Sequence, residues 1–148
     1  MIQETMQLHG SLTLFVLRAS GESETVHQDN LIVNVGFDFI ADAVGKSASR
    51  PGTMGYIALG TGTTAAAATQ SSLVTELDRN AATYAHTAGT KTFTFTADFA
   101  AGDATGAITE AGVFNAASAG IMFDRVVFPV VNKGADDSLT SVFTFTML

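Results

Sequence analysis

The fold class is decided by the stretch KTFTFTADF at residues 91–99. Apolar residues alternate with polar ones along it, and a period of two residues is typical of a β-strand with one buried face. The expected buried face holds Phe93, Phe95, Ala97 and Phe99. The motif FTFT recurs at residues 143–146, which predicts a second strand of similar burial.

Short segments of the same kind extend outward from this stretch in both directions. The expected strands cover residues 8–17, 24–33, 55–59, 79–87, 91–99, 107–114, 121–128 and 139–147, and residues 73–77 re-enter the core briefly. About nine short strands separated by turns are typical of an antiparallel sandwich or barrel. The sequence therefore predicts one all-β domain spanning residues 1–148, an antiparallel β-sandwich that is jelly-roll-like.

One segment has a helical period instead. Phe37, Ile40, Ala41 and Val44 follow the i, i+3, i+4, i+7 spacing and predict a short helix near residues 36–45 with these four side chains on its buried face. Asn34 is suited to the N-cap and Gly45 to the C-terminal stop. Residues 46–53 are expected to form a loop, and residues 60–68, the least specified stretch, a surface excursion.

The charge balance argues against several kinds of partner. The chain has 14 Asp and Glu against 7 Lys and Arg, a formal net charge of −7, and the basic residues form no run. Nucleic acids and anionic membranes select clustered cations, so neither is an expected partner. Only 14% of residues are charged, which suggests that much of the surface is covered by other subunits.

Targeting signals and disulfides are not expected either. There is no cysteine, so disulfides are excluded. No apolar run approaches the ~18 residues of a membrane helix, and the N-terminal region lacks the pattern of a signal peptide. We therefore expect synthesis in the cytoplasm.

No residue pattern predicts catalysis, a cofactor or a metal site. The three histidines lack a nucleophile context, and the acidic loops at Asp98/Asp103 and Asp136/Asp137 lack calcium-loop spacing. The G-x-G at residues 60–62 lacks the other parts of a phosphate loop.

Glu110 and Asp124 are the one pair that could serve as paired carboxylates. The favoured interpretation is structural, with Glu110 in a cross-strand salt bridge to Arg125. Gly112, between them in sequence, suggests a bulge or a close backbone approach.

Residues 1–7 have no clear period, and they form either a frayed end or an arm that reaches a neighbouring subunit. Apolar positions in this segment and in the 46–75 region are the candidate contacts with other subunits. The candidate assembly contacts are Met1, Ile2, Met6, Met54 and Tyr56.

Several segments together resemble a family of small phage and prophage virion proteins, of the head-decoration or tail-fibre-like kind. The segments are YIALGTGTT at residues 56–64, LVTELDR at 73–79 and RVVF at 125–128, with the most specific, GAITEAGVFN, at 106–115; DNLIVN at 29–34 is similar to the same family. The resemblance implies a non-enzymatic, β-rich virion component, expected to be a homotrimer.

We expect a capsid decoration (cement) protein on the outer capsid surface, with the major capsid protein as its partner. A single compact domain without shaft repeats and with an acidic, charge-poor composition suits that place. The alternative is a phage tail or tail-fibre-associated adaptor. A host-glycan-binding module and an enzyme are less favoured.

Overall fold

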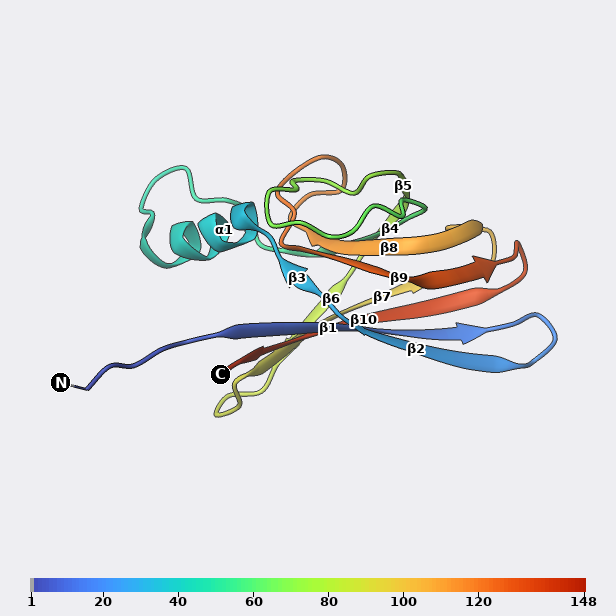
Figure 1. Ribbon diagram of the computed structural model, residues 1–148, viewed down its shortest axis with the longest axis horizontal. Coiled ribbons are helices and arrows are strands. Elements are labelled where there is room, and N and C mark those ends of the chain that lie inside the picture. Colours follow the sequence, from blue (N-terminus) through green and yellow to red (C-terminus); the bar gives the residue numbers. More distant parts are fainter. Residues whose placement is uncertain (1) are drawn as a thin grey trace.

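The structure, a computed structural model, describes residues 2–148, so Met1 lies outside the described residues. It contains one helix and ten strands (Figure 1). The elements are β1 (Leu8–Leu17), β2 (Ser23–Asp29), β3 (Leu31–Ile32), α1 (Asn34–Gly45), β4 (Tyr56–Gly60), β5 (Glu76–Ala81), β6 (Thr83–His86), β7 (Thr92–Phe99), β8 (Gly106–Phe114), β9 (Asp124–Lys133) and β10 (Ser138–Met147).

The ten strands form two five-stranded antiparallel sheets that face each other. Sheet 1 has the order β2-β1-β10-β7-β6, and sheet 2 has the order β3-β9-β8-β4-β5. The predicted all-β antiparallel sandwich is confirmed. The chain crosses four times between the sheets, and the hairpins β1–β2, β4–β5, β6–β7 and β8–β9 each stay within one sheet.

The strand count is ten rather than nine because some predicted strands divide where the chain changes sheet. The predicted strand at 79–87 is divided at Ala82 between β5 in sheet 2 and β6 in sheet 1. The predicted stop at Pro129 is wrong, since β9 continues to Lys133. Pro129 lies where the β8–β9 register shifts, a position that needs no ladder N–H.

The core lies between the inner faces of the two sheets. Leu12, Leu14 and Val16 of β1 point into it, as their alternation predicts, beside Phe143 and Phe145 of β10. The two FTFT motifs pair in register, so that Phe95 lies opposite Phe143 and Phe93 opposite Phe145. A smaller second cluster, which includes Phe114 and Met122, packs on the outer side of sheet 2 beneath the 61–75 loop.

The helix forms where predicted but presents a different face to the core. Gly36 is buried against the backbone of Phe123, and Phe39 meets the Phe123 ring edge-on at 6.2 Å. Phe37, Ala41 and Val44, predicted to be buried, are exposed, Phe37 to 51% and Val44 to 85%. The N-cap is Val33 without a side-chain cap, so Asn34 is the first helical residue and not the cap.

Candidate functional site

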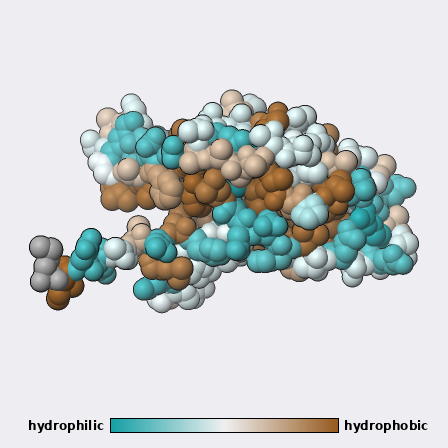
Figure 2. Space-filling model, viewed as in Figure 1, coloured by the Kyte–Doolittle hydropathy of each residue, from teal (hydrophilic) through white to brown (hydrophobic). Residues whose placement is uncertain are grey.

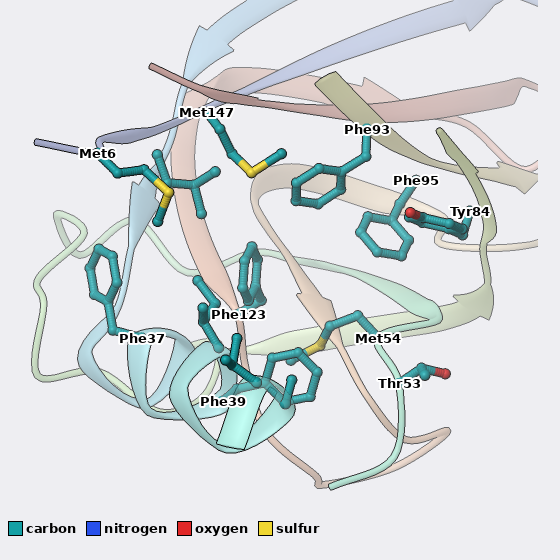
Figure 3. Close-up of a pocket in the computed structure, with 14 residues that line it drawn as sticks. Met6, Phe37, Phe39, Thr53, Met54, Tyr84, Phe93, Phe95, Phe123 and Met147 are labelled. Carbon is teal, nitrogen blue, oxygen red and sulfur yellow. The ribbon is translucent and has the colours of Figure 1, made fainter. Parts of the chain in front are cut away.

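An apolar groove lies between α1 and the end of sheet 1 nearest the N- and C-termini. It has a volume of about 550 Å³. Its walls are aromatic, aliphatic and methionine side chains, and Thr53 and Tyr84 supply the polar groups (Figure 3). Figure 2 shows the hydrophobic surface inside the cleft between the helix and the sheet below it.

Helix α1 forms one wall because its sequence carries apolar residues on two faces. Phe39 and Ile40 anchor the helix to the core, which leaves Phe37, Ala43 and Val44 along the groove. The opposite wall comes from the alternation in β6 and β7. Tyr84 lies 5.6 Å from Phe95, ring centre to ring centre, and remains 57% exposed.

The structure brings together two of the five predicted assembly contacts. Met6 and Met54 both line the groove, Met6 at 71% exposure and Met54 at 7%. Ile2 is 98% exposed beyond the body of the protein. Tyr56 packs against the second cluster on the outer side of sheet 2, away from the groove. Met1 lies outside the described residues. Sequence reasoning missed Phe37 and Val44, because their helical period indicated burial.

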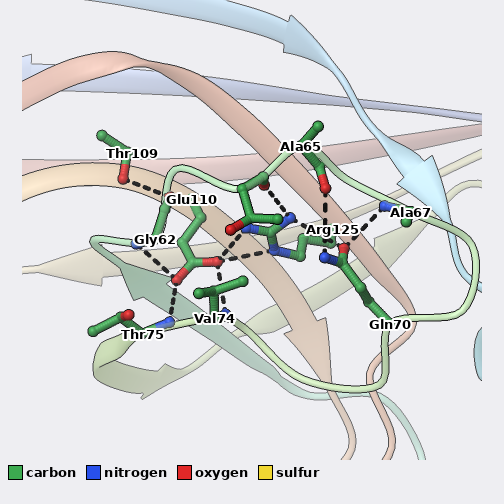
Figure 4. A network of polar contacts seen from close by, with 10 residues as sticks. Gly62, Ala65, Ala67, Gln70, Val74, Thr75, Thr109, Glu110 and Arg125 are labelled. Carbon is green, nitrogen blue, oxygen red and sulfur yellow. Dashed lines mark hydrogen bonds and ion pairs between the residues drawn. The ribbon is translucent and has the colours of Figure 1, made fainter.

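A second site is a buried ion pair between Glu110 of β8 and Arg125 of β9, which confirms the predicted salt bridge (Figure 4). Both side chains are fully buried. Arg125 Nε donates to Glu110 Oε2 at 2.9 Å, and Nη2 lies 2.7 Å from the same oxygen. Arg125 Nη1 donates to the carbonyl of Thr64 at 2.8 Å and to Gln70 Oε1 at 3.1 Å. The pair therefore holds the 61–75 loop onto sheet 2.

Backbone groups of the loop complete the coordination of Glu110. Its oxygens accept from the N–H groups of Gly62, Val74 and Thr75 at 3.0, 3.0 and 2.7 Å. Burial is the largest influence and raises the pKa of Glu110, but these donors and Arg125 outweigh it, and the pKa is lowered overall. A Cβ on Gly60 or Gly62 would come within 2.6 Å of the Glu110 carboxylate, so the G-x-G motif serves this close approach.

Asp124 is also fully buried, but within residues 2–148 its hydrogen-bond partners are neutral groups and not a cation. Its Oδ1 accepts from the N–H of Val113 at 3.0 Å, and its Oδ2 contacts Asn30 Nδ2. Burial raises its pKa to about 8 against these two hydrogen bonds. The predicted close approach at Gly112 is confirmed, since a Cβ there would lie 2.6 Å from the Asp124 carbonyl oxygen. Protein groups thus enclose both carboxyls of the Glu110–Asp124 pair.

The carboxylate of Asp137, in the acidic loop at Asp136/Asp137, links two turns of the chain. Asp137 accepts from the N–H of Ala19 at 2.9 Å and of Gly134 at 2.8 Å and pairs with Arg18 at 3.0 Å. These contacts, with Ala19 the strongest, lower the pKa of Asp137 to about 2. Over residues 2–148, no three His, Asp or Glu side chains converge as a metal would require.

No helix in the described part of the chain has the length and apolar character to cross a bilayer. Comparison with models of known protein families, with characterised proteins and with solved structures finds no match to this chain.

Proposed function

We propose that this chain is a bacteriophage capsid decoration protein that binds the outside of the assembled shell and stabilises it. The observation that carries the proposal is the apolar groove beside an exposed N-terminal segment, on a domain with few charges. Exposed apolar side chains that gather around a groove, as Phe37, Val44 and Tyr84 do, mark contact sites for other molecules, so the groove suits an assembly subunit. The resemblance of residues 106–115 to virion proteins supports the same role.

Stabilisation by such a protein follows from mass action. A subunit that binds the assembled shell and not its free capsomers shifts the equilibrium toward the shell. A homotrimer presents three copies of each contact, so weak individual contacts add through effective concentration. The proposed role is structural and non-catalytic, which agrees with the enclosure of Glu110 and Asp124.

The test is the number of copies per virion, measured by quantitative mass spectrometry against the major capsid protein. A decoration protein is expected at hundreds of copies. A handful of copies would overturn the capsid location and favour the tail adaptor. Adding the purified protein to undecorated capsids should then raise their thermal disruption temperature, and no change would contradict the cementing role.

A further inference from the structure

The N-terminal segment and the groove occur at the same end of the molecule, but the segment does not fill the groove. Backbone hydrogen bonds fix Gln7 to Leu148, N–H to O at 2.8 and 2.7 Å in the two directions. Residues 2–6 make none to the body, and Figure 1 shows them continuing the line of β1 away from it. We call residues 2–6 the arm.

Beyond Met6, the arm leads away from the groove of its own chain (Figure 1). Met6 lines the groove, whereas residues 2–5 can extend about 13 Å beyond it. Ile2 is almost completely exposed, and Val44 on the groove wall is too. The molecule thus carries an apolar groove and an apolar side chain directed past it.

The charges near the groove complement those of the arm. Glu4 is the only ionisable side chain of the arm. Three basic residues lie near the groove. Lys46 is the C-cap residue of α1, and Arg50 donates to the carbonyl of Ala43 on the groove wall. On the other wall, the carbonyl of Lys91 accepts from the N–H of Met147.

The acidic groups near this end include Asp38 and Asp42 of α1, Asp29 beside His9, and Glu4 of the chain's own arm, and Asp42 lies 3.5 Å from Lys46. Lys46 is thus already paired, and Arg50 and Lys91 form the basic rim that Glu4 of a second copy would meet.

We propose that the arm of one copy binds in the apolar groove of a second copy, with Ile2 in the groove and Glu4 at its basic rim. Donor and acceptor are different surfaces of the same chain, so the exchange is either reciprocal about a twofold axis or head-to-tail in a closed ring. The inference rests on the proposed assembly role and names the contact between copies.

Because the chain has no cysteine, engineered cysteines can test the contact directly. The single variants Ile2→Cys and Val44→Cys are purified separately, mixed and oxidised, and the mixed disulfide is identified by mass. The matched control replaces Val44→Cys by Val130→Cys, another exposed valine, on β9 in sheet 2.

The Ile2–Val44 disulfide should form at least about ten-fold faster than the control disulfide, because binding raises the effective concentration of the two thiols. Equal rates would overturn the proposal. A double variant that at high dilution forms the bond within one chain as readily as between chains would also overturn it, because the arm would then fold back on its own groove.

A second readout needs no cysteine. Val44→Asp changes a side chain that is 85% exposed, so the fold should be retained, and circular dichroism checks this. Sedimentation should show at least about ten-fold weaker self-association for this variant than for Val130→Asp. Unchanged association would contradict the proposal. Both readouts use isolated protein, so a low copy number in the virion would overturn the capsid role and leave arm exchange standing.

Discussion

At the scale of single residues, Asp124 and Asn30 share an unusual environment at the point where the chain passes from sheet 1 to sheet 2. Asn30 Oδ1 is buried without a hydrogen-bond partner in the described part of the chain. A protonated Asp124 could donate to that oxygen if the amide turned over, because the carboxylic acid carries one O–H. The raised pKa of Asp124 is consistent with this neutral form at pH 7.

Asp124→Asn should flatten the dependence of stability on pH. The pKa of Asp124 is about 8 in the folded protein against an ordinary 3.8, so the folded state binds more protons between these values. The contribution of Asp124 to the free energy of unfolding is complete below about pH 4 and is lost as the pH rises toward 8. The loss amounts to several kcal/mol, at about 1.4 kcal/mol per pKa unit.

Urea unfolding at pH 4.5, 6 and 8 measures the effect of Asp124→Asn, with the exposed Asp42→Asn as the control. The variant should lose less stability than the wild type over this range. Parallel profiles for wild type and variant would show that Asp124 is ionised in the folded protein at all three values.

The ion pair of Glu110 and Arg125 has a larger role in stability. Arg125→Met leaves the buried carboxylate without its cation, and losing one partner of such a pair costs about 3–5 kcal/mol. Lys46→Met removes an exposed pair with Asp42 and should cost only about 0.5 kcal/mol. Chemical denaturation gives both values. Similar small losses for the two variants would mean that water enters and solvates Glu110.

The salt bridge could be predicted from sequence because its two members lie on consecutive strands that carry few other charges. The remaining ligands of the carboxylate could not. The N–H groups of Gly62, Val74 and Thr75 belong to a loop without a period, and a backbone donor has no sequence signature of its own.

At the scale of elements, helix α1 shows how periodicity can identify an element and still misjudge its orientation. Residues 35–44 carry apolar side chains on more than one face, so the pattern permits two orientations. Gly36 selects between them, since only a residue without a side chain allows the helix to meet the carbonyl of Phe123. The face with Phe37 and Val44 is therefore left for the groove.

Gly36→Ala tests this contact. The added Cβ would lie 2.1 Å from the carbonyl oxygen of Phe123, so helix or strand must shift, and overpacking of this kind costs about 1–3 kcal/mol. Gly45→Ala in the same helix meets nothing within 4 Å and should stabilise by up to about 1 kcal/mol through helix propensity. Thermal unfolding of both variants measures the contrast, and equal effects would exclude Gly36 as the determinant of packing.

At the scale of the whole molecule, the sandwich could be predicted because alternation decides which side of each strand is buried. The division at Ala82 could not, because β5 and β6 form one continuous run of strand-like residues that bends between sheets. The groove could not be predicted either. It depends on how the helix, the Tyr84 hairpin and Met6 meet in space, and these segments lie far apart in the sequence.

Deleting residues 1–5 should leave the domain intact. Residues 2–5 make no hydrogen bond to the body, so the unfolding free energy of the dilute protein should change by less than about 0.5 kcal/mol. Deleting residues 1–7 removes the two hydrogen bonds between Gln7 and Leu148 as well and should cost about 1–2 kcal/mol. Denaturation at low concentration compares the two, and a large loss from the shorter deletion would show that the arm belongs to the fold.

The pairing of β1 with β10 governs how this protein can be made. Along the centre of sheet 1, Leu8 lies opposite Met147 and Leu17 opposite Ser138, so opposite ends of the chain must meet before the sheet exists. Residues 8–147 must therefore have left the ribosome before the sheet can form, and domains dominated by such distant pairings fold slowly, in about milliseconds to seconds. Until then the Phe-rich strands β7 and β10 can pair with other unfolded chains. Rapid synthesis of many copies therefore favours aggregation over correct folding.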